Sequence, residues 1–167
     1  MFNVKRFDAV LAKVVKAEGG IKKVILVDRT GLTIAHVSKF SYYPIDVDGI
    51  GAIASAVFCA SEEQGNNLDI GELGLVSSEF ENGKIFASSC GKGVLCVISD
   101  EDVNIGMVRL VMRKASDELS GMLEEFLAGR PGGVVPAAAP ATAGAPAADT
   151  SLEKDELEAA LRELEKF

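Results

Sequence analysis

The chain has 167 residues and a net charge of −8, a length that suits one domain of ordinary size and a tail. The acidic balance argues against binding to nucleic acid or to an anionic membrane surface, because both require a basic surface. The first residues contain no apolar signal-peptide core, and no segment approaches the length of a membrane span. We therefore expect a cytoplasmic protein without membrane insertion.

The first third of the chain predicts a helix followed by a β-hairpin. Apolar residues recur at helical spacing over residues 2–17, and Gly19-Gly20 predicts a left-handed end to this helix. Residues 21–27 and 32–37 are rich in aliphatic and β-branched side chains, which predicts two strands. Residues 28–31 form the turn between them, where Gly31 can take a positive φ.

Residues 46–64 predict the helix around which the domain is organised, because residues 49–61 carry no charge in an acidic chain. Asp46 or Asp48 can cap its N-terminus. At 100° per residue the bulky side chains gather on one face, which we expect to pack on the sheet. This face comprises Val47, Ile50, Ile53, Ala54, Val57 and Phe58.

The opposite face of this helix is small in its middle and would let a second helix approach closely. A core helix with an inert outer face is the explanation that the helix alone favours, and contact with a partner is the alternative that stays open. The face comprises Asp48, Gly51, Ala52, Ser55, Ala56, Cys59, Glu62 and Glu63.

The next segment predicts three strands and a long helix. The strands cover residues 72–80, 84–89 and 94–98, with a tight hairpin at Asn82-Gly83 and a second turn over residues 90–93. Asp100 and its neighbours precede a helix over residues 103–127 and are expected to cap it. The element order indicates an α/β (α+β) domain over residues 1–128, with a five-stranded antiparallel sheet and helices on both faces.

The C-terminal part has a different composition. Residues 129–150 consist mostly of Ala, Pro, Gly and Val and predict a flexible linker with a root-mean-square span of about 25 Å. Residues 151–167 predict a short amphipathic helix, with Leu157, Leu161 and Leu164 on one face. Because such a short helix is marginal alone in water, these leucines are expected to dock, either on the chain's own domain or on a partner.

No residue pattern predicts catalysis. His36 has no ligand or triad partner at a suitable spacing, and no phosphate-binding loop is present. Cys59, Cys90 and Cys96 lack metal-ligand spacing and are expected to be reduced packing residues, although Cys90 and Cys96 could face each other across a hairpin. We therefore predict no enzyme activity, no catalytic residue, no metal and no cofactor.

Three stretches, residues 24–35, 49–61 and 103–110, resemble Roadblock-type domains, the family of dynein light chain roadblock and of bacterial and archaeal regulators of small GTPases. The resemblance implies a profilin-like α/β/α sandwich with the central helix on one sheet face and the two terminal helices on the other. It also implies homodimers that join third-strand edges and pair central helices. The implied interface comprises Gly51, Ala52, Ser55, Ala56, Cys59, Glu72, Leu73, Leu75 and Val76.

The same resemblance implies that the paired helices bind a small Ras-like GTPase, with Asp48, Glu62 and Glu63 as candidate contacts. Because none of the arginines stands out as an arginine finger, we expect positioning of the GTPase and no donated catalytic group. The resulting hypothesis is a non-enzymatic homodimeric module that scaffolds or regulates a small GTPase. A small-molecule-sensing α/β module and a subunit of a motor or filament complex are the alternatives.

Overall fold

The computed structural model describes residues 5–40 and 45–128, all of which belong to one compact unit. The predicted linker over residues 129–150 and the predicted C-terminal helix, with Leu157, Leu161 and Leu164, lie outside the described residues. Within the described ranges, no helix is both long enough and apolar enough to cross a membrane.

The described residues form three helices and five strands in an antiparallel sheet with the order β2-β1-β5-β4-β3. This confirms the predicted α/β class and the five-stranded sheet. β1 and β5 are central because they carry nearly continuous buried aliphatic runs. The elements are α1 (Lys5–Ala17), β1 (Ile21–Asp28), β2 (Thr33–Ser38), α2 (Val47–Asn67), β3 (Val76–Phe80), β4 (Gly83–Cys90), β5 (Gly93–Ser99) and α3 (Ile105–Ala128).

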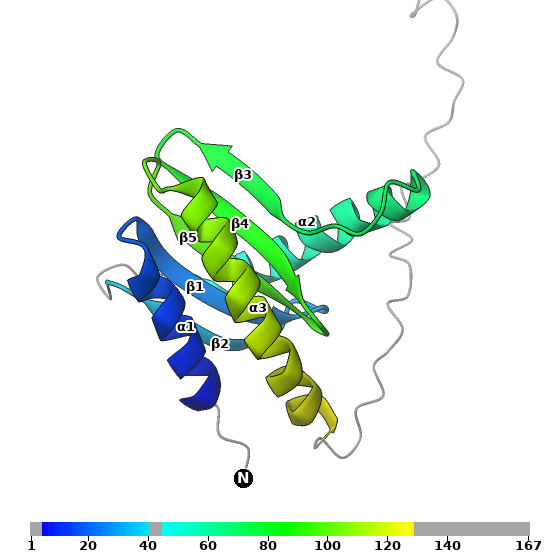
Figure 1. Ribbon diagram of the computed structural model, residues 1–167, viewed down its shortest axis with the longest axis horizontal. Coiled ribbons are helices and arrows are strands. Elements are labelled where there is room, and N and C mark those ends of the chain that lie inside the picture. Colours follow the sequence, from blue (N-terminus) through cyan, green and yellow to red (C-terminus); the bar gives the residue numbers. More distant parts are fainter. Residues whose placement is uncertain (1–4, 41–44, 129–167) are drawn as a thin grey trace, which may run out of the picture. The chain divides into compact units, whose positions relative to one another are not determined.

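The helices cover the two faces of the sheet unequally, as expected. α1 and α3 lie side by side on one face, while α2 crosses the other (Figure 1). The larger core lies beneath α1 and α3 and includes Leu11, Leu26 and Leu119. The smaller core lies beneath α2, where Phe58 packs with residues such as Ile25 and Val94. α2 is therefore held by one layer of contacts, on its sheet side only.

The first hairpin turn forms as predicted. A carboxylate oxygen of Asp28 accepts hydrogen bonds from the backbone N–H of Thr30 at 2.9 Å and of Leu32 at 3.0 Å. Gly31 adopts φ +91°, which an L side chain rarely takes. Asp46 likewise caps α2 by accepting from the Gly49 N–H at 2.9 Å.

Four local predictions need correction. The β3–β4 turn consists of Glu81 and Asn82, because Phe80 pairs with Gly83. Gly83 is required because no side chain fits there, since a Cβ would lie 2.6 Å from the Ser99 carbonyl oxygen.

Gly19 and Gly20 do not adopt positive φ, so the predicted left-handed end of α1 is wrong. α3 is capped by Asn104, which accepts from the Met107 N–H at 3.1 Å, and not by the acidic residues before it. The fourth correction concerns β3, which begins at Val76 and not at residue 72.

Candidate protein-interaction surface

α2 packs on the sheet through small residues, which reverses part of the predicted orientation. Gly51 and Ser55 are buried with Ala54 and Phe58. A Cβ on Gly51 would lie 2.6 Å from a methyl group of Val27, so glycine allows the helix to approach the sheet closely. The predicted interface residues Gly51 and Ser55 therefore face the chain's own sheet.

The β1–β2 turn also fixes the position of α2. The Ser55 hydroxyl lies 3.2 Å from the carbonyl oxygens of both Asp28 and Arg29 and can donate to either. A Cβ on Gly31 would lie 2.9 Å from the Ala52 Cα, so the absence of a side chain at Gly31 permits the turn to approach α2 this closely. α2 is thus held against the turn by its backbone and by a short polar side chain.

Because the small residues turn inward, two bulky residues turn outward. Ile53 is 66% exposed and Val57 is 43% exposed, although both were expected to pack on the sheet. Their neighbours Ala52, Ala56 and Ala60 are also exposed, and the face carries no charge between residues 49 and 61. α2 therefore presents an apolar strip to solvent, and we call Ile53, Ala56, Val57 and Ala60 the α2 strip.

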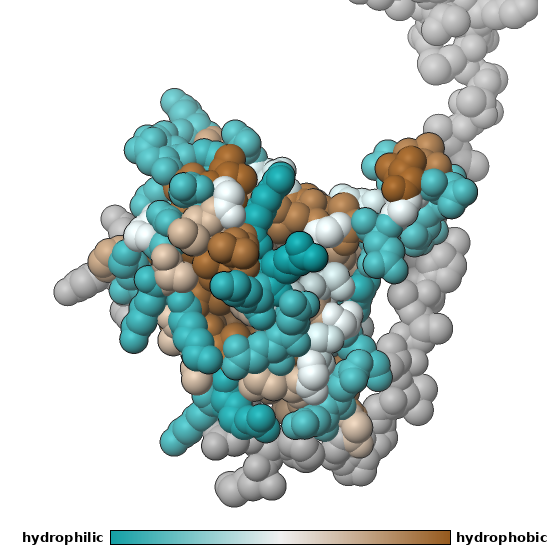
Figure 2. Space-filling view, in the orientation of Figure 1, coloured by the Kyte–Doolittle hydropathy of each residue, from teal (hydrophilic) through white to brown (hydrophobic). Residues whose placement is uncertain are grey.

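The far end of α2 extends this apolar character. α2 continues beyond the sheet in Figure 1, and hydrophobic surface is visible at that end in Figure 2. Leu68 is 62% exposed and Ile70 is 74% exposed there. Asp69, between them, adopts φ +52°, in the left-handed region. Single exposed apolar residues are common, but a series along one helix is typical of a contact surface.

β3 is an edge strand, which pairs with β4 and has no neighbour on its other side among the described residues. Val76 is its first residue, so Glu72, Leu73 and Leu75 do not belong to it. Leu73 and Leu75 instead pack partly against the two cores of the domain, and Glu72 is exposed. The free edge is therefore shorter than the sequence predicted and consists of residues 76–80.

Arg29 forms a network that the sequence pattern did not indicate. Its guanidinium makes a two-pronged ion pair with Glu62, lies 3.1 Å from the Ser89 hydroxyl, and sits 5.7 Å from the Phe58 ring centroid. The hydrogen bond to Glu62 raises the pKa of Arg29. Glu62, a predicted partner contact, is thus engaged within its own domain, whereas Asp48 and Glu63 are not part of this network.

The cysteines and His36 contribute no cluster to this surface. Cys96 pairs with Ala87 and Cys90 with Gly93, so the two cysteines lie in different cores and do not face each other. All three cysteines are free, as expected, but Cys59 is only half-buried. His36 is exposed on β2, and the described residues contain no group of three or more side chains that could hold a metal.

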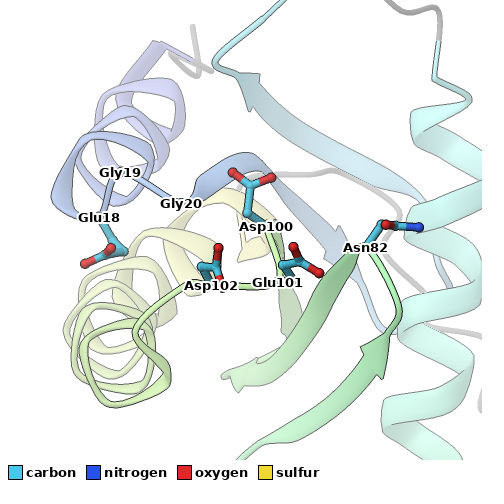
Figure 3. A pocket seen from close by; sticks show the side chains of 7 residues that line it. All are labelled: Glu18, Gly19, Gly20, Asn82, Asp100, Glu101 and Asp102. Carbon is cyan, nitrogen blue, oxygen red and sulfur yellow. The ribbon is translucent and has the colours of Figure 1, made fainter.

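A surface hollow of about 400 Å³ lies on the side of the sheet where α1 ends and α3 begins. Figure 3 shows acidic side chains from two segments around it, with Glu18 directed away from Asp100 and Glu101. Asp100 already pairs with Lys22, and the carbonyl of Glu101 accepts from Lys84. The carboxylates therefore do not converge on a common ligand position.

Comparison with known proteins places this geometry in a family. Residues 8–99 match the family model described as the Roadblock/LC7 domain. The chain belongs to the Roadblock/LC7 family. The Methanocaldococcus jannaschii proteins MJ0310 and MJ1340 are each 36% identical to it over 115 residues, which is 69% of this chain and 97% of each relative.

Solved structures agree with this assignment. Myxococcus xanthus MglB is 26% identical, with a TM-score of 0.66 over 75% of this chain and 94% of that one. The gliding protein MglB from Thermus thermophilus is 22% identical, with a TM-score of 0.66 over 73% of this chain and 91% of that one. The Roadblock/LC7 chain described here therefore shares its fold with MglB-type proteins.

Proposed function

We propose that this Roadblock/LC7 protein is a non-enzymatic homodimeric module that binds a small Ras-like GTPase. The observation that carries the proposal is the exposure of Ile53 and Val57 on an uncharged strip of α2, whose opposite face packs on the sheet. An exposed apolar strip on a rigid helix costs free energy in water, and pairing with a second copy of the same strip removes that cost.

The β3 edge supports the same arrangement. A free edge with unpaired backbone groups and an exposed Phe80 is a template for another strand. A second copy that joins this edge would continue the sheet and bring two α2 helices together on one face. The interface that we now propose includes Ala52, Ala56 and Val76 from the earlier set, with Cys59 at its margin. Ile53 and Val57 replace the inward-facing Gly51 and Ser55.

The resemblance to Roadblock-type domains supports the GTPase part of the proposal, because it implies paired central helices that bind a small Ras-like GTPase. Among the similar solved structures, one MglB is a gliding protein and another MglB has a tetrameric arrangement. Asp48 and Glu63 lie at opposite ends of the uncharged segment and are the candidate polar contacts.

The dimer is tested by placing a charge in the α2 strip. We expect Ile53→Asp to give a folded monomer in size-exclusion chromatography with light scattering, because two buried carboxylates would face each other across the symmetric interface. Ala56→Arg should act in the same way through bulk and charge. The matched control is Leu110→Asp, an exposed leucine on α3 at the other sheet face. Identical masses for wild type and Ile53→Asp would contradict the proposed dimer.

GTPase binding is tested in a pull-down experiment, with the Ile53→Asp variant as the negative control. A Ras-like GTPase from the same genome, loaded either with a non-hydrolysable GTP analogue or with GDP, serves as bait. We expect wild-type protein to be retained by one nucleotide state and Ile53→Asp to lose at least tenfold in retention. No retention of the wild-type protein in either state, with every such GTPase of that genome tried, would overturn this part of the proposal.

A further inference from the structure

The sheet face that carries α2 is covered by this helix at one end only. α2 lies at the end that holds the β1–β2 turn, because Ser55 contacts the turn and Glu62 pairs with Arg29. At the other end of the same face, Ile85 of β4 pairs with Ile98 of β5, and both side chains are only partly buried. One end of this apolar face is therefore not covered by any helix of the described residues.

A hollow of about 460 Å³ lies at this uncovered end. Ile85 and Ile98 line it together with Phe80, the last residue of the edge strand β3. Phe80 faces the α2 side of the sheet, because it follows Val76 by four residues along the strand and Val76 packs against the core beneath α2. Phe80 is 60% exposed, so the hollow has an open apolar rim. We call Phe80, Ile85 and Ile98 the sheet hollow.

The far end of α2 projects past the same edge of the sheet. α2 continues beyond β3 in Figure 1, and residues 68–75 then return to the start of that strand. Ile70 is 74% exposed, more than any other large apolar side chain of the described residues, and neither Leu68 nor Ile70 packs against the two cores. We call Leu68, Asp69 and Ile70 the α2 end. The domain thus has a projecting apolar end near the first residue of β3 and an open apolar hollow at the last.

A two-fold axis at the middle of β3 would bring these two features together. In an antiparallel pair of identical strands, the first residue of one lies beside the last of the other, so Val76 would lie beside Phe80 of the second copy. The distances agree, because Glu62 is linked through Arg29 to β4, and α2 advances about 9 Å from there to Leu68. Two strand spacings, from β4 to β3 and on to β3 of the second copy, are about 10 Å.

The charges of the two features are also complementary. Residues 40–83 contain no lysine or arginine, and Asp69 and Glu72 are exposed beside the apolar residues of the α2 end. The lining of the hollow includes Lys22 and Lys84 against one carboxylate, that of Glu81. Lys22 is already ion-paired, whereas Lys84 donates to a backbone carbonyl, which leaves its charge without a carboxylate partner among the described residues. An acidic apolar end therefore suits this hollow.

We propose that the α2 end of one copy occupies the sheet hollow of the other copy, and the reverse. This inference rests on the proposed dimer and adds to it, because the α2 strip and the β3 edge could pair while the hollow stays open. The contact would remove Leu68, Ile70 and Phe80 from water twice in each dimer, since two-fold symmetry repeats it. Each α2 would then be held by its own sheet and by that of the second copy, which fixes the two helices relative to each other before a GTPase binds.

The test uses charge substitutions in the full-length protein and analytical ultracentrifugation. We expect Ile70→Asp and Phe80→Lys each to raise the dimer dissociation constant about tenfold or more, because each places one charge in an apolar contact. In the double variant Ile70→Asp/Phe80→Lys the opposite charges meet across the interface, so the dissociation constant should return to within about threefold of the wild-type value. Leu110→Asp, an exposed leucine on the other sheet face, is the matched control and should leave it unchanged.

The outcomes distinguish this contact from the dimer itself. If Ile70→Asp dimerises as tightly as the wild-type protein while Ile53→Asp is a monomer, the dimer forms with an open hollow, and only the present inference is wrong. If both single substitutions weaken the dimer and the double variant is weaker still, the two residues do not meet, which also overturns it. A monomeric wild-type protein would overturn both the inference and the proposed dimer.

Discussion

At the scale of single residues, Arg29 connects three elements. It directly follows β1, and its guanidinium contacts Glu62 of α2 and Ser89 of β4. Both side chains of the ion pair are about one-third exposed, so solvent screens the pair in part. Arg29→Ala should lower the free energy of unfolding by about 1–2 kcal/mol, through the lost pairing and the lost contact with Phe58. Arg29→Lys should recover less than half of this, since an ammonium group cannot make the two-pronged pair.

A double-mutant cycle with Arg29→Ala and Glu62→Ala, followed by urea denaturation, measures the pair itself. We expect a coupling free energy of about 1 kcal/mol. Additive effects of the two substitutions would show that the geometry of the pair contributes no stability.

Burial raises the pKa of both the Cys90 and the Cys96 thiols to about 12, from a usual value of 9.0. The folded state therefore keeps its thiol protons at a pH where the unfolded chain releases them. Stability from this source is complete below pH 9 and declines as pH rises from 9 to 12. Between pH 8 and pH 10 we expect a loss of about 1.4 kcal/mol per thiol in the free energy of unfolding, measured by urea denaturation.

The matched control for this effect is Cys90→Ala/Cys96→Ala. All other titrating groups are common to the two proteins, so the difference between their pH profiles reports the thiols. Parallel profiles between pH 8 and pH 10 would mean that the two thiols ionise freely in the folded protein.

At the scale of elements, Gly51 determines how close α2 lies to the sheet. Gly51→Ala would put a methyl group 2.6 Å from Val27, which is itself fully buried and β-branched and cannot move aside. We expect a loss of about 1–3 kcal/mol in the free energy of unfolding from overpacking. Gly121→Ala is the matched control in α3, where no atom lies within 4 Å, and should stabilise by about 0.5–1 kcal/mol. Stabilisation by both substitutions would refute the close packing of α2.

The same helix shows how far the sequence could be interpreted. Its approximate limits followed from charge and periodicity, which also left Asp46 and Asp48 as the two candidate caps. Its position alone on one sheet face was implied by the resemblance to Roadblock-type domains. Its rotation followed from neither, because periodicity weighs side chains by hydrophobicity and assigns the bulkiest ones to the core. Here the Val27 side chain on β1 leaves no room for a side chain at position 51, and the carbonyl groups of the β1–β2 turn accept from the short Ser55 side chain, so these small residues face the sheet beside Ala54 and Phe58. The competing contacts come from residues 27–31, which lie 21 to 27 positions earlier in the chain, so a helical wheel does not include them.

The edge strand and the Arg29 network were missed for related reasons. Residues 72–75 have strand-like spacing. In a regular strand Leu73 and Leu75 would face the same side of the sheet, but they contact different cores, and the pairing of β3 with β4 begins only at Val76. Arg29, Glu62 and Ser89 are far apart in sequence and have no common motif. By contrast, the hairpins, the antiparallel five-stranded sheet and the helices at α1 and α3 were predictable from the residues, because hairpin turns and helical periodicity are local signals. The placement of α1 and α3 together on one sheet face was implied only by the resemblance to Roadblock-type domains.

At the scale of the whole molecule, the two sheet faces expose different surfaces. The α2 face carries the apolar strip proposed to pair with a second copy, and the other face carries α1 and α3, with Met107 and Leu110 of α3 exposed. The two surfaces are separated by the sheet and its buried cores. Substitutions on one face should therefore leave the other unaffected, and their effects on stability should add.

This separation makes thermal unfolding informative about the dimer. Folded dimers dissociate as they unfold, so their midpoint rises with protein concentration, whereas the midpoint of a monomer does not. About 120 described residues per copy, at about 0.7 kcal/mol each, give an unfolding enthalpy of about 170 kcal/mol per dimer. At a midpoint near 60 °C this predicts a rise of about 3 °C for each tenfold increase in concentration.

Ile53→Asp should abolish this concentration dependence, and Leu110→Asp should preserve it, because only the first substitution lies in the α2 strip. Calorimetry over a hundredfold range of concentration would then show a rise of about 6 °C for the wild-type protein and for Leu110→Asp. A flat midpoint for the wild-type protein would mean that the exposed Ile53 and Val57 face water in a monomer. The platform for a GTPase would then have to be formed by one copy of α2 alone.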